Sequence, residues 1–175
     1  MLFRLLASGL IGKNNKNASI LFDNEISISL NAEGENCGSI IGDNNGIITT
    51  NNIIVKDSSL TATNFLGGFI GVSSSTDTNG GININGVFSL NNNTLNSEKA
   101  SNVGGFIGNL TSQEDITLEN ININNTINYS KSNNSMIGGF IGNLNTNGNF
   151  KLKVNNKSNI SINANIGIIG GIIAN

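Results

Sequence analysis

Acidic side chains are the residues of this chain whose type could support catalysis. Paired carboxylates act as general acid and base in the cleavage of glycosidic bonds, often beside Arg, Lys or a bound cation. Glu33 and Glu35 have the spacing of one strand face but stand in a loop-like stretch, 31–36, and the single Arg is Arg4. The acids are Asp23, Glu25, Glu33, Glu35, Asp43, Asp57, Asp77, Glu98, Glu114, Asp115 and Glu119. We interpret all of them as scattered surface or corner residues, which predicts no catalytic residue.

Nucleophilic and cofactor chemistry also lack their usual residues. The chain has no His, the commonest general base and a common metal ligand. Cys37 therefore has no His to activate it, and as the single Cys it forms no intramolecular disulfide. It stands where later repeats have Gly, which predicts a small buried side chain. We expect no enzymatic activity and no cofactor.

Metal and polyanion binding have little support in the sequence. The stretches 43–46 and 114–115 carry oxygen donors that suit calcium, but the Gly-Gly-x-Gly-x-Asp calcium repeat is absent. The net charge of -2 and the lack of a basic stripe argue against a nucleic-acid partner. No Lys-Ser/Thr pair follows the Gly-rich segments, so they do not form a phosphate-binding loop. We expect no metal site and no nucleic-acid partner.

A repeated five-residue phrase dominates the sequence. Degraded copies occupy 8–12, 37–42 and 170–174, and the closing positions 12, 42, 71, 108, 142 and 174 are separated by 30, 29, 37, 34 and 32 residues. Such a period is typical of stacked repeats, so we assign the phrase a structural role. Its three perfect copies are Gly67, Gly68, Phe69, Ile70, Gly71; Gly104, Gly105, Phe106, Ile107, Gly108; and Gly138, Gly139, Phe140, Ile141, Gly142.

Short alternating segments fill the intervals between the copies. In the fourth repeat, 116–123 alternates apolar and polar residues with one slip at 119–120, which predicts a strand with a bulge or corner. A second alternating segment, 124–130, follows it, and no helical period is present. The sequence therefore predicts an all-β protein, a parallel β-helix (β-solenoid) of about five coils with roughly three short strands each. We expect one domain, 1–175, that is a fragment of a longer repeat protein.

Stacking the repeats aligns the apolar residues of the phrase into two columns, one of Phe69, Phe106 and Phe140 and one of the Ile residues that follow them. Adjacent residues of a strand point to opposite faces. Either a bulge at the glycines turns both columns inward, or one column faces outward as a binding strip. We favour the buried arrangement and one continuous core. We also expect the Gly-Gly pair to adopt positive φ and to permit close approach between coils.

Asn supplies most of the polarity of the chain, with 37 of 175 residues, while only 11% of residues are charged. Ordinary domains have roughly 25% charged residues. Asn tolerates the left-handed backbone of tight corners. Identical Asn side chains can also stack into amide ladders when strands lie in register. We expect both uses of Asn in this chain.

The N-terminal segment has two interpretations. Residues 1–12 resemble a weak signal peptide, but 9–12 also fit the repeat register, and we favour the repeat. No apolar run approaches the ~18–20 residues that span a membrane. The longest, 166–174, contains three Gly. We therefore expect a protein that does not span the membrane.

The phrase resembles the GLUG motif, whose typical core is Gly-Gly-Leu-Val-Gly, in five or six copies over most of the chain. The sequence departs from it in preferring Phe-Ile to Leu-Val and in its Asn-rich linkers. It is also similar to the Gly-Gly-Ala-Ile and Phe-x-x-Asn repeats of chlamydial polymorphic membrane proteins, with one Phe-x-x-Asn match at 88–91. Both resemblances imply a β-solenoid in a secreted or surface protein, as in adhesins and autotransporter passengers.

These expectations favour a non-enzymatic, secreted or cell-surface segment that acts as a stalk or as a binding surface for host glycan or protein. An exposed aromatic ladder would favour adhesion, and uniform Asn/Ser/Thr faces would favour a spacer. The alternatives are a remnant of a carbohydrate-active β-helix enzyme and a small free-standing solenoid that self-assembles. No polar cap is visible at 169–175, so we also expect end-to-end association through the open strand edges.

Overall fold

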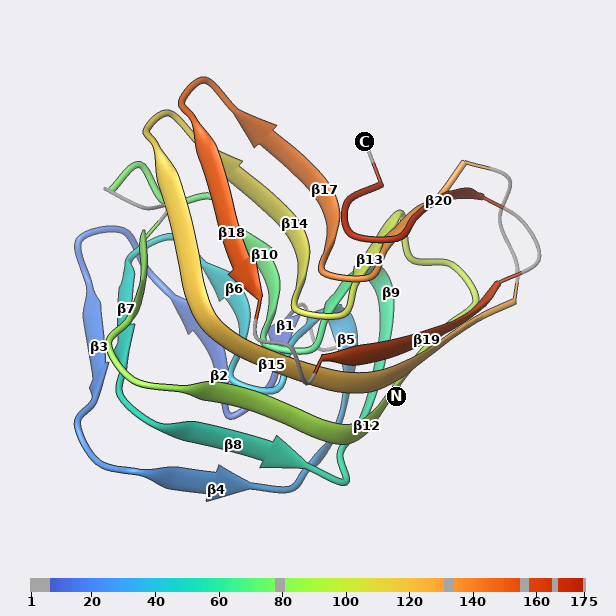
Figure 1. The fold of residues 1–175 in the computed structure, drawn as a ribbon, viewed down its shortest axis with the longest axis horizontal. Helices are drawn as coiled ribbons and strands as arrows, with labels where there is room; N and C mark the ends of the chain where they lie inside the picture. The colour runs from blue at the N-terminus through green and yellow to red at the C-terminus, as the bar shows by residue number, and fades with distance from the viewer. Residues whose placement is uncertain (1–6, 78–80, 131–133, 155–157, 165–166, 175) are drawn as a thin grey trace, which may run out of the picture.

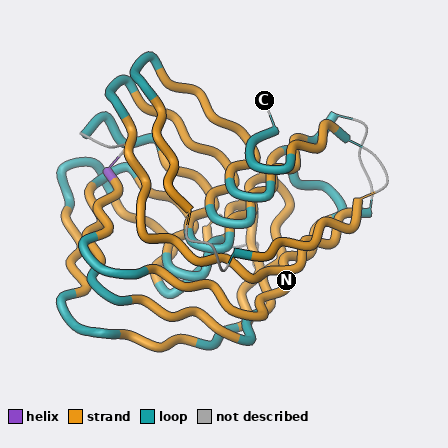
Figure 2. Tube along the Cα trace, viewed as in Figure 1, coloured by secondary structure: helices purple, strands orange, loops and turns teal. Residues whose placement is uncertain are grey.

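The chain winds as a β-solenoid of about four turns in the computed structural model (Figure 1). The structure describes residues 7–77, 81–130, 134–154, 158–164 and 167–174. Strands and loops account for nearly all of them (Figure 2), and every strand pair is parallel. Strands of the middle coils hydrogen-bond to strands one coil earlier and one coil later, so the predicted parallel β-helix is confirmed, with about four turns in place of the expected five coils.

Three sheets form the walls of the solenoid. The five-stranded sheet contains β2 (Ile11–Asn14), β6 (Ile41–Asn44), β10 (Ile70–Ser73), β14 (Ile107–Ser112) and β17 (Ile141–Thr146). The three-stranded sheet contains β3 (Ser19–Phe22), β7 (Ile47–Thr50) and β11 (Ile82–Ile84). The 12-stranded sheet contains β1 (Ala7–Ser8), β4 (Ile26–Ile28), β5 (Asn31–Cys37), β8 (Ile53–Lys56), β9 (Ser59–Gly67), β12 (Phe88–Ser97), β13 (Asn102–Gly104), β15 (Ile116–Tyr129), β16 (Met136–Gly138), β18 (Phe150–Val154), β19 (Asn159–Ala164) and β20 (Ile168–Gly170).

The repeated phrase joins the 12-stranded sheet to the five-stranded sheet. In the fourth coil the first Gly ends β13 and the Ile begins β14. The carbonyl of Phe106 accepts hydrogen bonds from the N–H groups of both Phe69 and Ile70, at 2.7 and 3.3 Å. This shared acceptor marks a bend that turns both apolar side chains inward. The two columns are buried in the middle coils, so the expected inward arrangement is confirmed.

The three glycines of the phrase leave no room for a side chain. A Cβ on Gly104 would lie 1.9 Å from the carbonyl oxygen of Ile107, in the same coil. On Gly105 it would lie 2.0 Å from the carbonyl oxygen of Gly139 in the next coil. On Gly108 it would lie 2.5 Å from the carbonyl oxygen of the preceding coil. Close approach between coils is therefore confirmed as a reason for these glycines.

The predicted positive φ at the Gly-Gly pairs of the perfect copies is wrong. Among the described residues, glycines with positive φ are Gly9, Gly81 and Gly167, at 149°, 73° and 128°. Of these, only Gly9 belongs to a copy of the phrase, a degraded one. The perfect copies need glycine for space, because the backbones of successive coils meet there, and not for an unusual backbone conformation.

Apart from these three glycines, the positive-φ residues of the described chain are Asn and Asp. Asn17, Asn92 and Asn120 have φ of 64°, 56° and 58°, and Asp57 has φ of 50°. Asn120 lies where the pairing of β15 with β18 shifts register, between Leu118 and the next paired residue. The expected corner at the slip in 119–120 and the expected use of Asn at corners are both confirmed.

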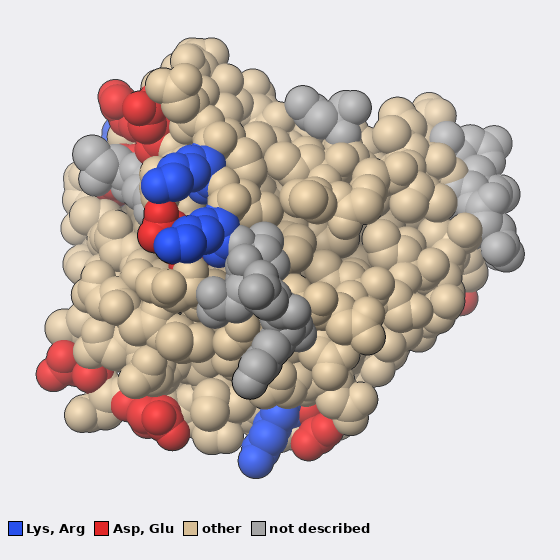
Figure 3. All heavy atoms as spheres, in the orientation of Figure 1, with Lys and Arg blue, Asp and Glu red and all other residues tan. Residues whose placement is uncertain are grey.

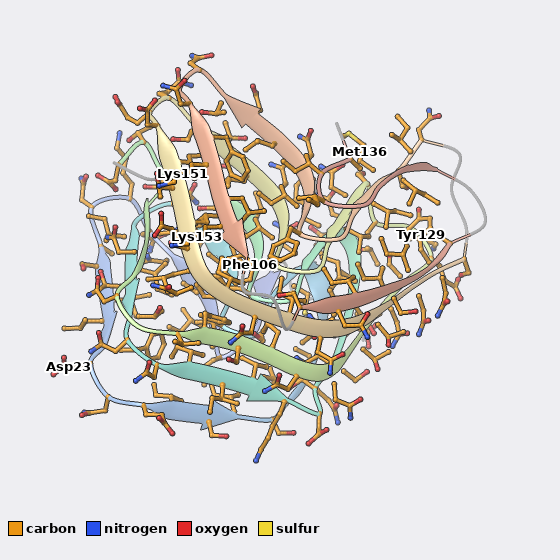
Figure 4. All side chains as sticks on the ribbon, viewed as in Figure 1. Asp23, Phe106, Tyr129, Met136, Lys151 and Lys153 are labelled. Atoms are coloured by element: carbon orange, nitrogen blue, oxygen red, sulfur yellow. The ribbon has the colours of Figure 1, made fainter. Side chains whose placement is uncertain are left out.

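The interior divides into two hydrophobic clusters in place of the single core expected from the sequence. The larger cluster holds the Phe and Ile columns of the phrase. Its aromatic centre is Phe69, whose ring centroid lies 4.4 Å from that of Phe88 and 5.0 Å from that of Phe106. Figure 4 shows Phe106 in this lobe and Tyr129 in the other. The smaller cluster is Cys37, Leu60, Ala62, Leu66, Leu95, Ala100, Val103, Ile127, Tyr129 and Ile137.

Candidate functional site

Two buried amide ladders tie successive coils together. In the first, Asn14 donates to Asn44 at 2.8 Å and Asn44 donates to Ser73 at 3.0 Å, all at the end of the five-stranded sheet. In the second, the side chain of Asn93 donates to Asn125 at 3.0 Å. All five side chains are buried. These ladders confirm the expected stacking of Asn, and they satisfy polar groups inside the core.

A third ladder lies on the outer face of the 12-stranded sheet. Asn163 donates to Asn128 at 3.0 Å, and Asn128 donates to Asn96 at 3.0 Å. The strand pairing places Thr61 next in the same column. These four side chains come from β9, β12, β15 and β19, one from each successive coil. They therefore form a polar stripe parallel to the solenoid axis, on the side of the molecule where β12, β15 and β19 run together in Figure 1.

The stripe runs along a hollow of about 530 Å³. Side chains of both polar and apolar character line it, because the buried residues that alternate with the stripe reach its floor. Its lining residues are Thr61, Ala62, Thr63, Asn96, Ser97, Glu98, Lys99, Asn128, Tyr129, Ser130 and Asn163. We take this hollow as the candidate functional site of the described chain.

One rim of the hollow is held by hydrogen bonds to its floor. The hydroxyl of Ser97 donates to the carbonyl of Ala62 at 2.8 Å and accepts from the N–H groups of Lys99 and Ala100 at 3.2 and 2.8 Å. The hydroxyl of Tyr129 donates to the carbonyl of Ala100 at 3.2 Å. These bonds fix the turn that presents the exposed Glu98 and Lys99 at the rim.

Charged groups lie mostly elsewhere. Figure 3 shows them in a few small clusters, with most of the visible face uncharged. Lys151 on β18 lies 2.9 Å from the carboxylate of Glu119, and its hydrogen bond and its charge lower the pKa of Glu119 below the ordinary value. Figure 4 shows Lys151 and Lys153 together on β18. Lys13 pairs with Asp43 at 3.7 Å.

Several of the carboxylates accept a hydrogen bond from an Asn one coil further on. Asn92 donates to Asp57 at 2.8 Å, and the side chain of Asn149 donates to Asp115 at 3.2 Å. These carboxylates therefore act as corner groups that join coils. Among the described residues, no three acidic, Cys or His side chains form a group suited to a metal ion.

The placement of Glu33 and Glu35 in a loop is wrong. Both belong to β5, which pairs with β1 and β9. The residues of this stretch form a strand because they stack in register on the alternating residues of the next coil. Cys37 ends the same strand and is fully buried, as expected, but its expected alignment with a Gly of later repeats is wrong, because it pairs with Leu66. Its thiol donates to the carbonyl of Ala32 at 3.6 Å.

The fifteen residues of the perfect phrases lie away from the hollow, at the bend between two sheets. Sequence reasoning missed the polar stripe because it aligned the repeats on this phrase alone. A second alignment, on the buried column of Leu60, Leu95 and Ile127, would have placed Thr61, Asn96 and Asn128 in one row, since each directly follows a member of that column.

Comparison with protein-family models, with curated proteins and with solved structures finds no match. In the part of the chain that the structure describes, no helix is long and apolar enough to cross a membrane. The fold and the hollow are therefore the grounds on which a function can be proposed.

Proposed function

We propose that this chain is a non-enzymatic segment of a secreted or cell-surface repeat protein, in which a β-solenoid stalk carries a polar binding surface. The observation that carries the proposal is the column of Ile residues, which pairs without a break from Ile11 through Ile41, Ile70, Ile107 and Ile141. In such a core each coil is stabilised only by contacts with the coils next to it. The resulting stack provides length and a lateral surface.

The residues on the outer faces favour the role of a stalk rather than that of an aromatic adhesion strip. The Phe column of the phrase is buried, and outward positions of the 12-stranded sheet carry hydroxyl and amide groups. Ser59, Thr94, Thr126 and Ser161 form one such column, beside the stripe that includes Thr61. The resemblance of the phrase to the GLUG motif supports a surface protein as the setting.

Location is tested on intact cells of the source organism. An antibody against the folded chain should label unpermeabilised cells or the culture medium, and external protease should remove the cell-bound signal. Labelling that requires permeabilisation, with the chain absent from the medium, would overturn the proposed location. An antibody against a cytosolic protein serves as the control for cell integrity.

The stalk is tested by pulling single molecules from their ends. A stack of coils held by neighbour contacts should yield in several steps, each releasing the length of one repeat at roughly 3.5 Å per residue. Unfolding in one undivided step at low force would argue against a load-bearing role. The repeat lengths of 29–37 residues set the expected step sizes.

Self-assembly is a second candidate, favoured by exposed apolar side chains at the solenoid ends. Leu10 in the first coil and Ile172 in the last are 52% and 54% exposed, although their counterparts between them are buried. Open strand edges pair readily with another chain. This candidate concerns the 175-residue chain by itself.

A further inference from the structure

The hollow presents hydrogen-bonding groups at a regular spacing. Thr61, Asn96, Asn128 and Asn163 come from four successive coils and lie in one column. Neighbouring strands are about 4.8 Å apart, so the column repeats at about that distance along the axis. A ligand that uses the whole column must itself be extended and must offer polar groups at a similar repeat.

The amides of the stripe are held in orientation before any ligand arrives. Asn128 donates one hydrogen to Asn96 and accepts one from Asn163, both at 3.0 Å. An amide group has two donor hydrogens and an oxygen with two lone pairs. The ladder therefore uses half of the capacity of Asn128 and leaves one donor and one acceptor for a ligand. Groups fixed in advance bind with a smaller loss of conformational entropy.

The chemistry of the lining selects among ligand classes. Glu98 and Lys99 on one rim have opposite charges, so the lining has no net charge. The exposed Glu33 pairs with Thr61 and continues the column beyond the hollow, which further disfavours an acidic ligand. The strands beneath the stripe are paired on both sides where it crosses β12 and β15, so an extended peptide cannot add to the sheet there. The lining combines hydroxyl, amide and apolar groups. That mixture suits a ligand rich in hydroxyls with small apolar faces.

We propose that this hollow binds an uncharged, extended glycan chain, which lies along the solenoid axis with its hydroxyl groups hydrogen-bonded to Thr61, Asn96, Asn128 and Asn163. The inference deepens the proposed function, because it names the class of partner for the surface of a secreted or cell-surface segment. Binding itself is a property of the folded chain and can be measured wherever the chain resides in the cell.

The test uses the purified chain and neutral oligosaccharides of glucose, xylose, mannose and N-acetylglucosamine, linear and branched, from disaccharide to hexasaccharide. An immobilised array of these probes identifies binding, and amide NMR titration with the same probes locates it. Linear probes should bind with affinity that rises with length and then levels off once the column is covered. Chemical-shift changes should centre on β12 and β15.

Single substitutions distinguish glycan binding in the hollow from binding elsewhere on the chain. Asn128→Ala should weaken binding about ten-fold through the loss of a hydrogen bond, and Thr61→Val, which keeps the side-chain shape, should weaken it several-fold. Asn122→Ala is the matched control, because Asn122 lies on the same strand and donates to Ser89 at 3.2 Å, outside the hollow. Circular dichroism checks that each variant is folded.

Two results would overturn the inference. One is the absence of any binding by the neutral probes at millimolar concentration, in the array and in NMR. The other is binding that Asn128→Ala and Thr61→Val leave unchanged. Either result leaves the stalk proposal standing, since that rests on location and mechanics. Intracellular location with intact glycan binding would instead remove the stalk proposal and keep this site.

Discussion

At the scale of single residues, the same residue type takes different roles according to where the coils place it. Gly105 faces the backbone of the next coil, whereas Gly171, at the same place in the last copy of the phrase, has no atom within 4 Å of an added Cβ. Asn93 is buried, whereas Asn96 on the same strand is half-exposed. Substituting the two residues of each pair and comparing the changes in stability distinguishes the effect of position from that of residue type.

Gly105→Ala should destabilise the protein by about 3 kcal/mol, the upper part of the usual range for overpacking, because the new methyl group meets the carbonyl oxygen of Gly139 at 2.0 Å. Gly171→Ala should change stability by less than about 0.5 kcal/mol. Denaturant unfolding followed by circular dichroism measures both. Equal effects of the two substitutions would show that space between coils is not the reason for glycine.

Asn93→Ala should destabilise the protein by about 3 kcal/mol, because it leaves buried polar groups without partners. The side chain of Asn93 accepts from the N–H of Ser58 at 3.0 Å and donates to the carbonyl of Val55 at 3.2 Å. Asn96→Ala removes a half-exposed amide and should cost about 0.5 kcal/mol or less. A similar loss for the two variants, in the same denaturant assay, would contradict a special role for the buried ladder.

At the scale of elements, β15 shows how one long strand of the 12-stranded sheet turns a corner. Residues 116–118 and Ile121 pair with β18 and residues 124–129 pair with β19, and the backbone turns at Asn120, within the part that pairs with β18. In the preceding coil the same path is divided between β11 and β12. The left-handed residue therefore allows a corner without ending the strand.

Asn120→Ala should destabilise the protein by about 1 kcal/mol, because a residue with Cβ is strained at positive φ. Asn120→Gly should be neutral or slightly stabilising at this exposed position. Thermal and denaturant unfolding of the two variants test the sign of each change in the free energy of unfolding. If Ala and Gly prove equal, the corner does not depend on the left-handed conformation.

The ion pair between β15 and β18 predicts a titration. The side-chain hydrogen bond and charge of Lys151 lower the pKa of Glu119, so this contribution to stability is present above the ordinary carboxyl pKa and is lost as the pH falls through the lowered value. Lys151→Met should return the pKa of Glu119 toward its ordinary value. Lys153→Met, the control, should move it less. NMR titration of the Glu119 side chain measures both, and an unchanged pKa in Lys151→Met would refute the assignment.

The elements could be predicted from the sequence wherever a repeated residue set the register. The Ile of each phrase aligned the five-stranded sheet correctly through to Ile173, which bridges to Ile141. The slip before Ile121 located the corner of β15. Repetition is informative here because in-register parallel stacking converts sequence period directly into spatial contact.

The polar hollow and the second core cluster could not be predicted in the same way. The phrase does not align them. The row of Thr61, Asn96 and Asn128 follows from a different column, Leu60, Leu95 and Ile127, and the rim also involves the hydrogen bond from the hydroxyl of Ser97 to the carbonyl of Ala62. The sequence predicted Asn at left-handed corners and Gly for close approach between coils, but not that the Gly-Gly pairs of the perfect copies lack positive φ, since both residue types allow that conformation. The surroundings decide between them, and those are set by the neighbouring coil.

At the scale of the whole molecule, the solenoid has two unlike ends and no closing symmetry. β17 and Ile173 continue the columns of the phrase toward one end, and β2 begins them at the other. A head-to-tail contact between two such ends repeats without closing, which produces filaments.

The 175-residue chain should therefore associate in a concentration-dependent way. Ile172→Lys should reduce the association by placing a charge on the end of the apolar column. Leu21→Lys is the control, because Leu21 is 60% exposed on a lateral face of β3. Sedimentation velocity over a concentration series measures the species present. A single monomeric species at every concentration would rule out assembly through the ends.

The variable repeat length has a consequence for how such a protein changes over generations. β10 ends at Ser73 and β11 begins at Ile82, whereas β6 ends at Asn44 and β7 begins at Ile47, yet β7 and β11 stay in register. Insertions at that corner therefore leave the stack intact. A gene that duplicates one block of codons between two phrases adds a coil whose partners above and below are already compatible. Recombination can thus adjust the reach of the protein in whole coils without any new core having to evolve.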